Sequence, residues 1–217
     1  MSGPLCSWVL AAALAAAGIT AGAPDDAYLR WSAKQAAEIG TEAYVRGRVG
    51  GVFDARFLKT ERPFNYKLAA TWLTGDVIRA TARLAQLASR LSAPETNALV
   101  TEAESVAGTV IMIEIDPREG SGVIPSTWEA FLQPKGRSPD AVRGTINPQL
   151  RDVKALSGVL RRNYDYDRFW VVFPLAHADG RPLFTATDVT AELVVRIHDK
   201  EGHVEWTILD AIRTAPK

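Results

Sequence analysis

Cysteine is almost absent from this sequence, since Cys6 is the only one among 217 residues. A chain with a single cysteine forms no intramolecular disulfide and has no cysteine set that could hold zinc. We expect Cys6 to be removed with an export signal, which would leave no thiolate nucleophile. Export without disulfides is more typical of a bacterial envelope protein than of a small eukaryotic secreted protein.

An excess of charge of either sign is also missing, because 25 Lys and Arg residues balance 25 Asp and Glu residues. Nucleic-acid binding depends on a net basic field, so we predict no nucleic-acid partner. Beyond the N-terminal segment, no apolar run approaches the roughly 20 residues that a membrane-spanning helix needs. The mature part is therefore predicted to have no transmembrane segment.

Residues 1–23 are predicted to be a signal peptide. The apolar run from Trp8 to Ile19 has the length of a signal core and is too short to span a bilayer. Small residues at Thr20 and Gly22 place the cleavage after Gly22. Positions 2–7 contain no Lys or Arg, although this part of a signal is normally basic. An uncleaved N-terminal membrane anchor or a misassigned start codon therefore stays open beside export to the periplasm or the medium.

The mature chain, residues 24–217, is predicted to be a single α+β domain. Its first part, 24–108, carries mainly helical patterns, and its second part, 109–217, has mostly the two-residue period of strands. We expect N-terminal helices, including a helical hairpin, to pack on a C-terminal antiparallel sheet of five or more strands. The alternative is that the strands form a sandwich with the helices at one side.

Three helices are predicted in the first part. One extends from Ala27 to about Tyr44, and a second begins at the N-cap Thr74. A third begins at Ser92, which forms a capping box with Glu95, and it extends to about Ala107. The very short link between the second and third helices is typical of a helical hairpin.

Strands are predicted over Thr109–Asp116 and Arg168–Leu175, followed by a return strand over Leu183–Thr187. Residues 132–150, rich in Pro, Gly and charge, are predicted to be a long loop or a pair of short edge strands. Residues 153–160 fit either a strand or a helical turn, because a run this short does not distinguish the two.

A hairpin is predicted from Leu193 to Ile208, with a four-residue loop over Asp199–Gly202. We expect His198 to face His203, Arg196 to face Glu205 and Val195 to face Trp206. This register places apolar residues on one face and polar residues on the other, as a half-buried antiparallel sheet requires.

His198 and His203 are the candidate metal ligands. In the predicted register their Cβ atoms lie about 5 Å apart, close enough to share Zn²⁺ or Cu²⁺ with a nearby carboxylate. Asp199, Glu201 and Glu205 could supply that carboxylate, and His177 could join only if the two hairpins are neighbours. The plainer interpretation is a solvent-exposed hairpin end with ordinary polar histidines.

Two carboxylate pairs could serve as acid and base, namely Glu114 with Asp116 and Asp165 with Asp167. Such residues are more often the solvated face of a strand. No G-x-S-x-G elbow is present, and the glycine-rich segment 47–51 follows a helix instead of a strand, so it is interpreted as a helix terminus. No cofactor is predicted, and the sequence does not identify which residues would be catalytic.

Basic and aromatic side chains alternate along residues 46–67. The candidate binding residues in this segment are Arg56, Lys59, Arg62, Tyr66 and Lys67. Such a segment can bind anionic lipid, an anionic glycan or an acidic protein, or its aromatic side chains can simply anchor it in the core. We therefore predict an exported, non-catalytic binding module for an envelope protein, a glycan or an anionic lipid surface. The alternative is a secreted hydrolase or metal-dependent enzyme that uses the acids or the His198/His203 pair.

Overall fold

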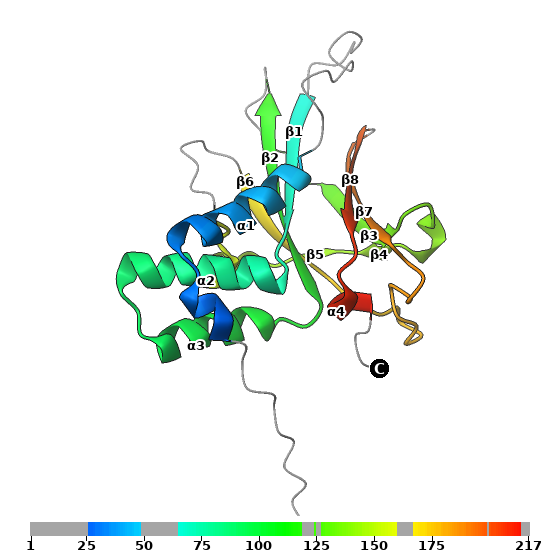
Figure 1. Cartoon of the computed structure of the whole chain (residues 1–217). Coiled ribbons are helices and arrows are strands. Elements are labelled where there is room, and N and C mark those ends of the chain that lie inside the picture. Colours follow the sequence, from blue (N-terminus) through cyan, green and yellow to red (C-terminus); the bar gives the residue numbers. More distant parts are fainter. Residues whose placement is uncertain are drawn as a thin grey trace, which may run out of the picture.

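The computed structural model describes residues 26–48, 65–118, 124, 127–159, 167–198 and 200–213. The predicted signal peptide, and Arg56, Lys59 and Arg62 of the predicted basic-aromatic surface, lie outside these residues. Helices occupy the N-terminal half and strands occupy mostly the C-terminal half, so the protein has the predicted α+β fold (Figure 1). None of the helices in the described ranges has the length and apolar character to cross a membrane.

The described residues contain four α-helices, and their bounds are α1 Ala33–Arg46, α2 Gly75–Ser89, α3 Ala93–Glu104 and α4 Asp210–Arg213. Eight strands are present in the described ranges. Their bounds are β1 Asn65–Trp72, β2 Thr109–Arg118, β3 Trp128–Pro134, β4 Val142–Arg143, β5 Thr145–Ile146, β6 Asp167–Phe173, β7 Thr190–Ile197 and β8 Lys200–Thr207.

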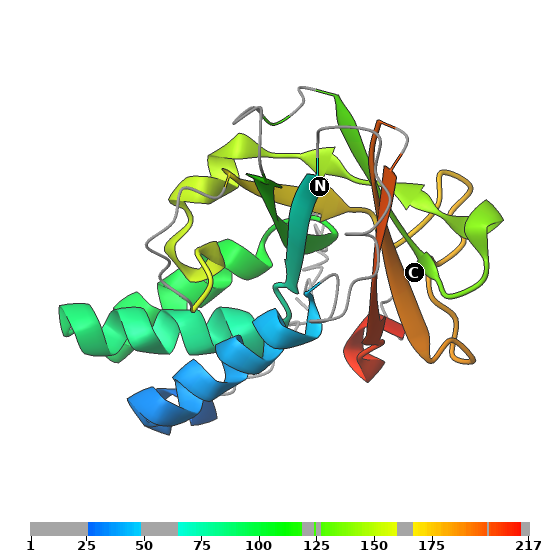
Figure 2. The ribbon, with the colours of Figure 1, turned by 90° about the horizontal axis from the view of Figure 1, so that it is seen from above.

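The strands form two antiparallel sheets of four strands each, in the orders β1-β2-β6-β5 (sheet A) and β4-β3-β7-β8 (sheet B). The two sheets face each other, and helices α1, α2 and α3 lie on the far side of sheet A (Figure 2). The molecule is therefore a three-layer structure of helices, sheet A and sheet B. Of the two predicted architectures, the sandwich with helices at one side is the one that forms.

Two apolar cores hold these layers together. The first lies between the sheets and contains fully buried side chains such as Ile113, Phe173 and Leu193. The second lies between sheet A and the helices and contains Val77, Leu156 and the partly polar Trp170. Sheet A is apolar on both faces and contributes to both cores. Burial of this surface is the main favourable contribution to folding.

The predicted first helix is interrupted. Asp26–Arg30 form a 3-10 helix, and α1 begins only after Ser32. Ser32 and Gln35 form a capping box, in which the Gln35 amide N–H donates to Ser32 Oγ at 3.2 Å. The Ser-x-x-Gln pattern therefore starts a new helix at this point.

The other two predicted helix starts are confirmed, with one difference in detail. Ser92 forms the predicted capping box with Glu95 at the start of α3. Thr74 occupies the N-cap position of α2, but its side chain makes no capping hydrogen bond. Helix α3 ends at Glu104, earlier than predicted.

The strand predictions are partly confirmed. Strands β2 and β6 form where predicted, and the segment 132–150 contains the two short edge strands β4 and β5. Strand β1, in the part expected to be mainly helical, and strand β3 are not predicted from the sequence. The return strand over Leu183–Thr187 is wrong, because Leu183 and Phe184 are buried core residues outside any strand. Residues 154–156 form a 3-10 helix, which is the helical one of the two alternatives.

The predicted hairpin forms, but its predicted register is wrong. Ile197 pairs with Lys200, Arg196 with Glu201 and Val194 with His203, so the loop contains only residues 198 and 199. His198 lies in this loop with φ at 55°, and His198 and His203 are not cross-strand partners. The observed register differs from the predicted one by an even number of residues. Such a slip keeps every side chain on its face, so alternation alone cannot distinguish the two.

Candidate functional site

The outer face of sheet B, the side that points away from sheet A, carries a network of hydrogen-bonded and ion-paired side chains. Helices α1, α2 and α3 all lie beyond sheet A, so none of them covers this face (Figure 2). Strand alternation and the observed registers place a row of mainly polar side chains from each strand here, besides Thr190 and Thr207 at one end. These are Glu129, Phe131, Gln133, Arg143, Glu192, Val194, Arg196, Glu201, His203 and Glu205.

The centre of this face is apolar. Phe131 of β3 is the cross-strand partner of Val194 on β7, and Val194 is only 7 % exposed. The same row continues to Arg143 on β4 and to His203 on β8. The Arg196 guanidinium lies 5.6 Å from the centroid of the Phe131 ring, which is within the range of a cation–π contact.

A chain of hydrogen bonds crosses the face beside this apolar centre. Gln133 is 5 % exposed, and its Nε2 donates to Glu192 Oε2 at 2.8 Å. The other carboxylate oxygen, Glu192 Oε1, lies 2.9 Å from His203 Nδ1. Burial works against ionisation of Glu192, but the hydrogen bonds from His203 and Gln133 outweigh it and lower the pKa of this carboxyl. Glu192 is therefore held as a carboxylate by neighbours on both sides.

Ion pairs surround the centre of the face. Arg196 binds Glu201 at 2.6 Å, Lys135 binds Glu205 at 2.7 Å, and the Arg143–Glu129 pair is 2.9 Å long. The side chains in these pairs are 38–67 % exposed. Exposed pairs of this kind contribute little to stability, roughly 0–1 kcal/mol each. Exchanging them for contacts with another molecule would therefore cost the fold little.

The predicted metal site is not assembled in the predicted way, because His198 lies in the loop of the hairpin and His203 on its strand. His203 contacts Glu192 and, through Nε2 at 3.5 Å, Glu201. In the described ranges, no group of three or more His, Cys, Asp or Glu side chains is arranged to hold a metal ion. His177 lies in a turn where its amide N–H donates to Arg181 O at 2.8 Å.

The described members of the two predicted carboxylate pairs lie on opposite sides of sheet A. Glu114 and Asp116 lie on the helix-facing side of sheet A, whereas the register places Asp167 on the opposite side. Asp165 lies outside the described residues. Glu114 is 2 % exposed and accepts a hydrogen bond from Arg168 Nε at 3.1 Å. Burial raises the pKa of Glu114, and the charge of Arg168 opposes this effect.

The described part of the predicted basic-aromatic surface is small. Tyr66 and Lys67 lie on β1, where they pair with Pro117 and Asp116 of β2. Lys67 is partly buried. Gly47 ends α1, in agreement with the interpretation of the glycine-rich segment as a helix terminus.

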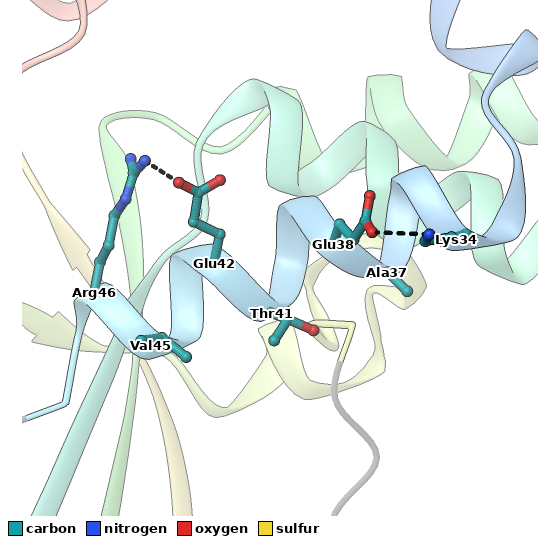
Figure 3. Close-up of a pocket in the computed structure, with 7 residues that line it drawn as sticks. All are labelled: Lys34, Ala37, Glu38, Thr41, Glu42, Val45 and Arg46. Atoms are coloured by element: carbon teal, nitrogen blue, oxygen red, sulfur yellow. Dashed lines mark hydrogen bonds and ion pairs between the residues drawn. The ribbon is translucent and has the colours of Figure 1, made fainter.

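A shallow hollow follows the exposed side of α1, and Figure 3 shows the residues that line it. The described lining residues are Lys34, Ala37, Glu38, Thr41, Glu42, Val45 and Arg46. Lys34 pairs with Glu38, and Arg46 with Glu42, one helical turn apart along α1. These are ordinary surface pairs of a helix, and none of the lining residues is held in the arrangement of a catalytic acid, base or nucleophile.

Sequence reasoning missed most of this face, because it assigned no strand to residues 128–134. The signal was present, since Trp128, Ala130 and Leu132 alternate with Glu129, Phe131 and Gln133. His203, with Glu201 and Glu205 that were considered beside it as carboxylate ligands, belongs to the outer face of sheet B. No family model matches the chain, and no curated protein and no solved structure matches it either.

Proposed function

We propose that this protein is an exported, non-catalytic module that binds another protein through the outer face of sheet B. The observation that carries the proposal is the arrangement of this face, with Phe131 and Val194 at its centre and paired charges around them. Protein interfaces typically have an apolar centre with an aromatic residue and arginine, inside a polar rim. On the outer face of sheet B, Phe131 and Val194 form such an apolar centre, and the ion pairs around them form the polar rim.

The charges of the face favour a protein over the other two partners considered from the sequence. Four acidic side chains, Glu129, Glu192, Glu201 and Glu205, alternate with Arg143, Arg196, Lys135 and His203. An anionic lipid surface or glycan would require a net positive patch. A surface with both signs fits a protein with the complementary arrangement of both signs.

Export is part of the proposal and rests on the sequence of the first 23 residues. The protein produced in its native host should have lost the residues up to Gly22, which intact mass measures directly. An uncut chain found in the membrane fraction would support the anchored alternative, and an uncut chain in the cytoplasm would contradict export.

Site-specific photo-crosslinking in the native host tests the proposed binding face. A photoreactive phenylalanine analogue at Phe131 should give one dominant adduct with another protein. The matched control places the analogue at Thr41, on the exposed side of α1, where the adduct should be absent. Loss of the Phe131 adduct on Arg196→Glu substitution would link the contact to the charges of the face.

The absence of any adduct at Phe131, in a variant that folds like the wild type, would contradict the proposal. The same adduct from both Phe131 and Thr41 would also contradict it, because it would indicate proximity without a specific binding face. Hydrolytic activity or stoichiometric bound metal in the purified protein would instead support the enzyme alternative.

A further inference from the structure

The free edge of strand β8 is the longest strand edge without a neighbour in the described ranges. Sheet B has the order β4-β3-β7-β8, so β8 pairs with β7 on one side only. The register with β7 is continuous from Lys200 to Thr207, without a bulge or a proline. The edge of β1 differs, because Gly47 O accepts from the Ala70 amide at 2.8 Å and Arg48 bridges to Ala69. An open strand edge presents unpaired N–H and C=O groups to another chain.

We propose that β8 pairs with β8 of a second copy of this chain, in an antiparallel register centred on Val204. The two sheets B would then form one continuous sheet across a twofold axis, with the same surface contributed by each copy. The pattern of side chains along β8 favours a second β8 strand as the partner and determines the register in which the two strands pair. This inference does not depend on what the outer face of sheet B binds.

The first restriction on the register is that the inner, apolar side chains of one β8 must lie opposite the inner side chains of the other. In antiparallel pairing, directly opposite residues point to the same side of the sheet. The inner side chains of β8 include Val204 and Trp206, and the outer ones include His203 and Glu205. Inner residues therefore meet inner residues only when the axis passes through a residue, not between two residues. Registers centred on His203 and on Val204 satisfy this condition with the longest overlap.

Charge distinguishes these two registers. A register centred on His203 would place Glu201 opposite Glu205 of the second copy, twice, and Lys200 opposite Trp206. A register centred on Val204 places His203 opposite Glu205 of the second copy, twice, and Glu201 opposite Thr207. Opposite charges in direct cross-strand positions are favourable and like charges are unfavourable. Only the register centred on Val204 therefore avoids the two direct glutamate–glutamate contacts.

Packing on the inner side agrees with this register. Val204 lies opposite Val204, and Gly202 of the second copy lies opposite the large Trp206 side chain. Trp206 is 8 % exposed. Because Gly202 has no side chain, it leaves room for the indole ring that lies opposite it.

Sedimentation equilibrium of the full chain tests the dimer. The single change His203→Glu should weaken the dimer about tenfold, because it places a glutamate directly opposite Glu205 of the other copy, twice. The double swap His203→Glu with Glu205→Lys should restore it. The matched control is the swap Glu129→Lys with Arg143→Glu, at the opposite edge of sheet B, which should leave the dimer unchanged.

Disulfide trapping tests the register without relying on these charges. In a Cys6→Ser background, Val204→Cys should form a covalent dimer on mild oxidation, and His203→Cys should not. A covalent dimer from His203→Cys instead would overturn the register. A chain that stays monomeric at all concentrations and is trapped by neither cysteine would overturn the proposal.

Discussion

At the scale of single residues, two buried or partly buried glutamates behave in opposite ways because their surroundings differ. Glu192 receives hydrogen bonds from Gln133 and His203, which stabilise its charged form. Glu114 lies in the apolar layer between sheet A and the helices, where burial outweighs its bond to Arg168. The two carboxyls should therefore make opposite contributions to the pH dependence of stability.

Glu192 should stabilise the fold at neutral pH and lose this contribution in acid. Its pKa is lowered by folding, so the stabilisation is present above the pKa of the unfolded chain and disappears as the pH falls through the folded-state pKa. Glu192→Gln should reduce the free energy of unfolding at pH 7 by about 1–2 kcal/mol, and less at pH 3. Urea denaturation at both values measures this, and an equal loss at pH 3 and pH 7 would contradict it.

Glu114 should show the reverse sign. Its pKa is raised by folding, so the native state holds the proton more tightly and stability falls as the pH rises through the range above the ordinary glutamate value. Glu114→Gln removes this titration, so the variant should lose less stability than the wild type between pH 5 and pH 7.5. The measurement is the free energy of unfolding in urea across that range. A variant with a steeper decline than the wild type would show that the charge of Arg168 dominates over burial.

At the scale of elements, short sequence signals determine where the helices begin. The structure shows that these signals differ in the capping hydrogen bonds that they form. Ser92 makes the hydrogen bonds of a capping box, whereas Thr74 occupies the same position at α2 without a capping bond. Ser92→Ala should therefore lower the free energy of unfolding by about 1 kcal/mol. Thr74→Ala is the matched control and should cost clearly less. Equal losses in chemical denaturation would mean that the Ser92 bonds contribute no specific stability.

Gly144 is where the chain passes from sheet B to sheet A. Its amide N–H donates to Ala130 O at 2.9 Å, and the Asn147 amide then donates to Trp170 O at 2.8 Å. A Cβ at position 144 would lie 2.4 Å from Val171 Cγ1 and 2.6 Å from the Phe173 ring. The sandwich can close at this point only because the residue has no side chain.

Gly144→Ala should accordingly destabilise the protein by about 1–3 kcal/mol, the usual cost of overpacking a core. Gly136→Ala is the control, since nothing lies within 4 Å of its Cβ position and only its positive φ of 77° opposes the change. Thermal unfolding compares the two. A Gly144 variant as stable as the wild type would show that the two sheets can separate locally without cost.

At the scale of the whole molecule, sheet A links the two cores, so the layers should unfold together. Leu156 belongs to the core under the helices and Leu193 to the core between the sheets, and both are fully buried. Substitution of either by Ala should cost about 2–5 kcal/mol and lower one common transition. Helical circular dichroism and tryptophan fluorescence should then give coincident curves. Two separate transitions, each sensitive to one substitution, would show two independent units instead.

Local patterns in the sequence were sufficient for the fold class, two of the helix starts and strands β2 and β6. These features depend on residues within a few positions of one another, such as Ser92 with Glu95 or the run Thr109–Asp116. The absence of any disulfide in the chain also followed directly from the single cysteine.

Tertiary structure decided the rest, because several arrangements satisfied the same local pattern. The β7–β8 register could slip by an even number of residues without moving a side chain between faces, so only the two-residue loop fixed it. Strand β1 lies between helical segments in sequence and forms a strand through its pairing with β2. The outer face of sheet B combines three distant segments, around Phe131, Glu192 and His203, and only the packing of the sheets brings them together.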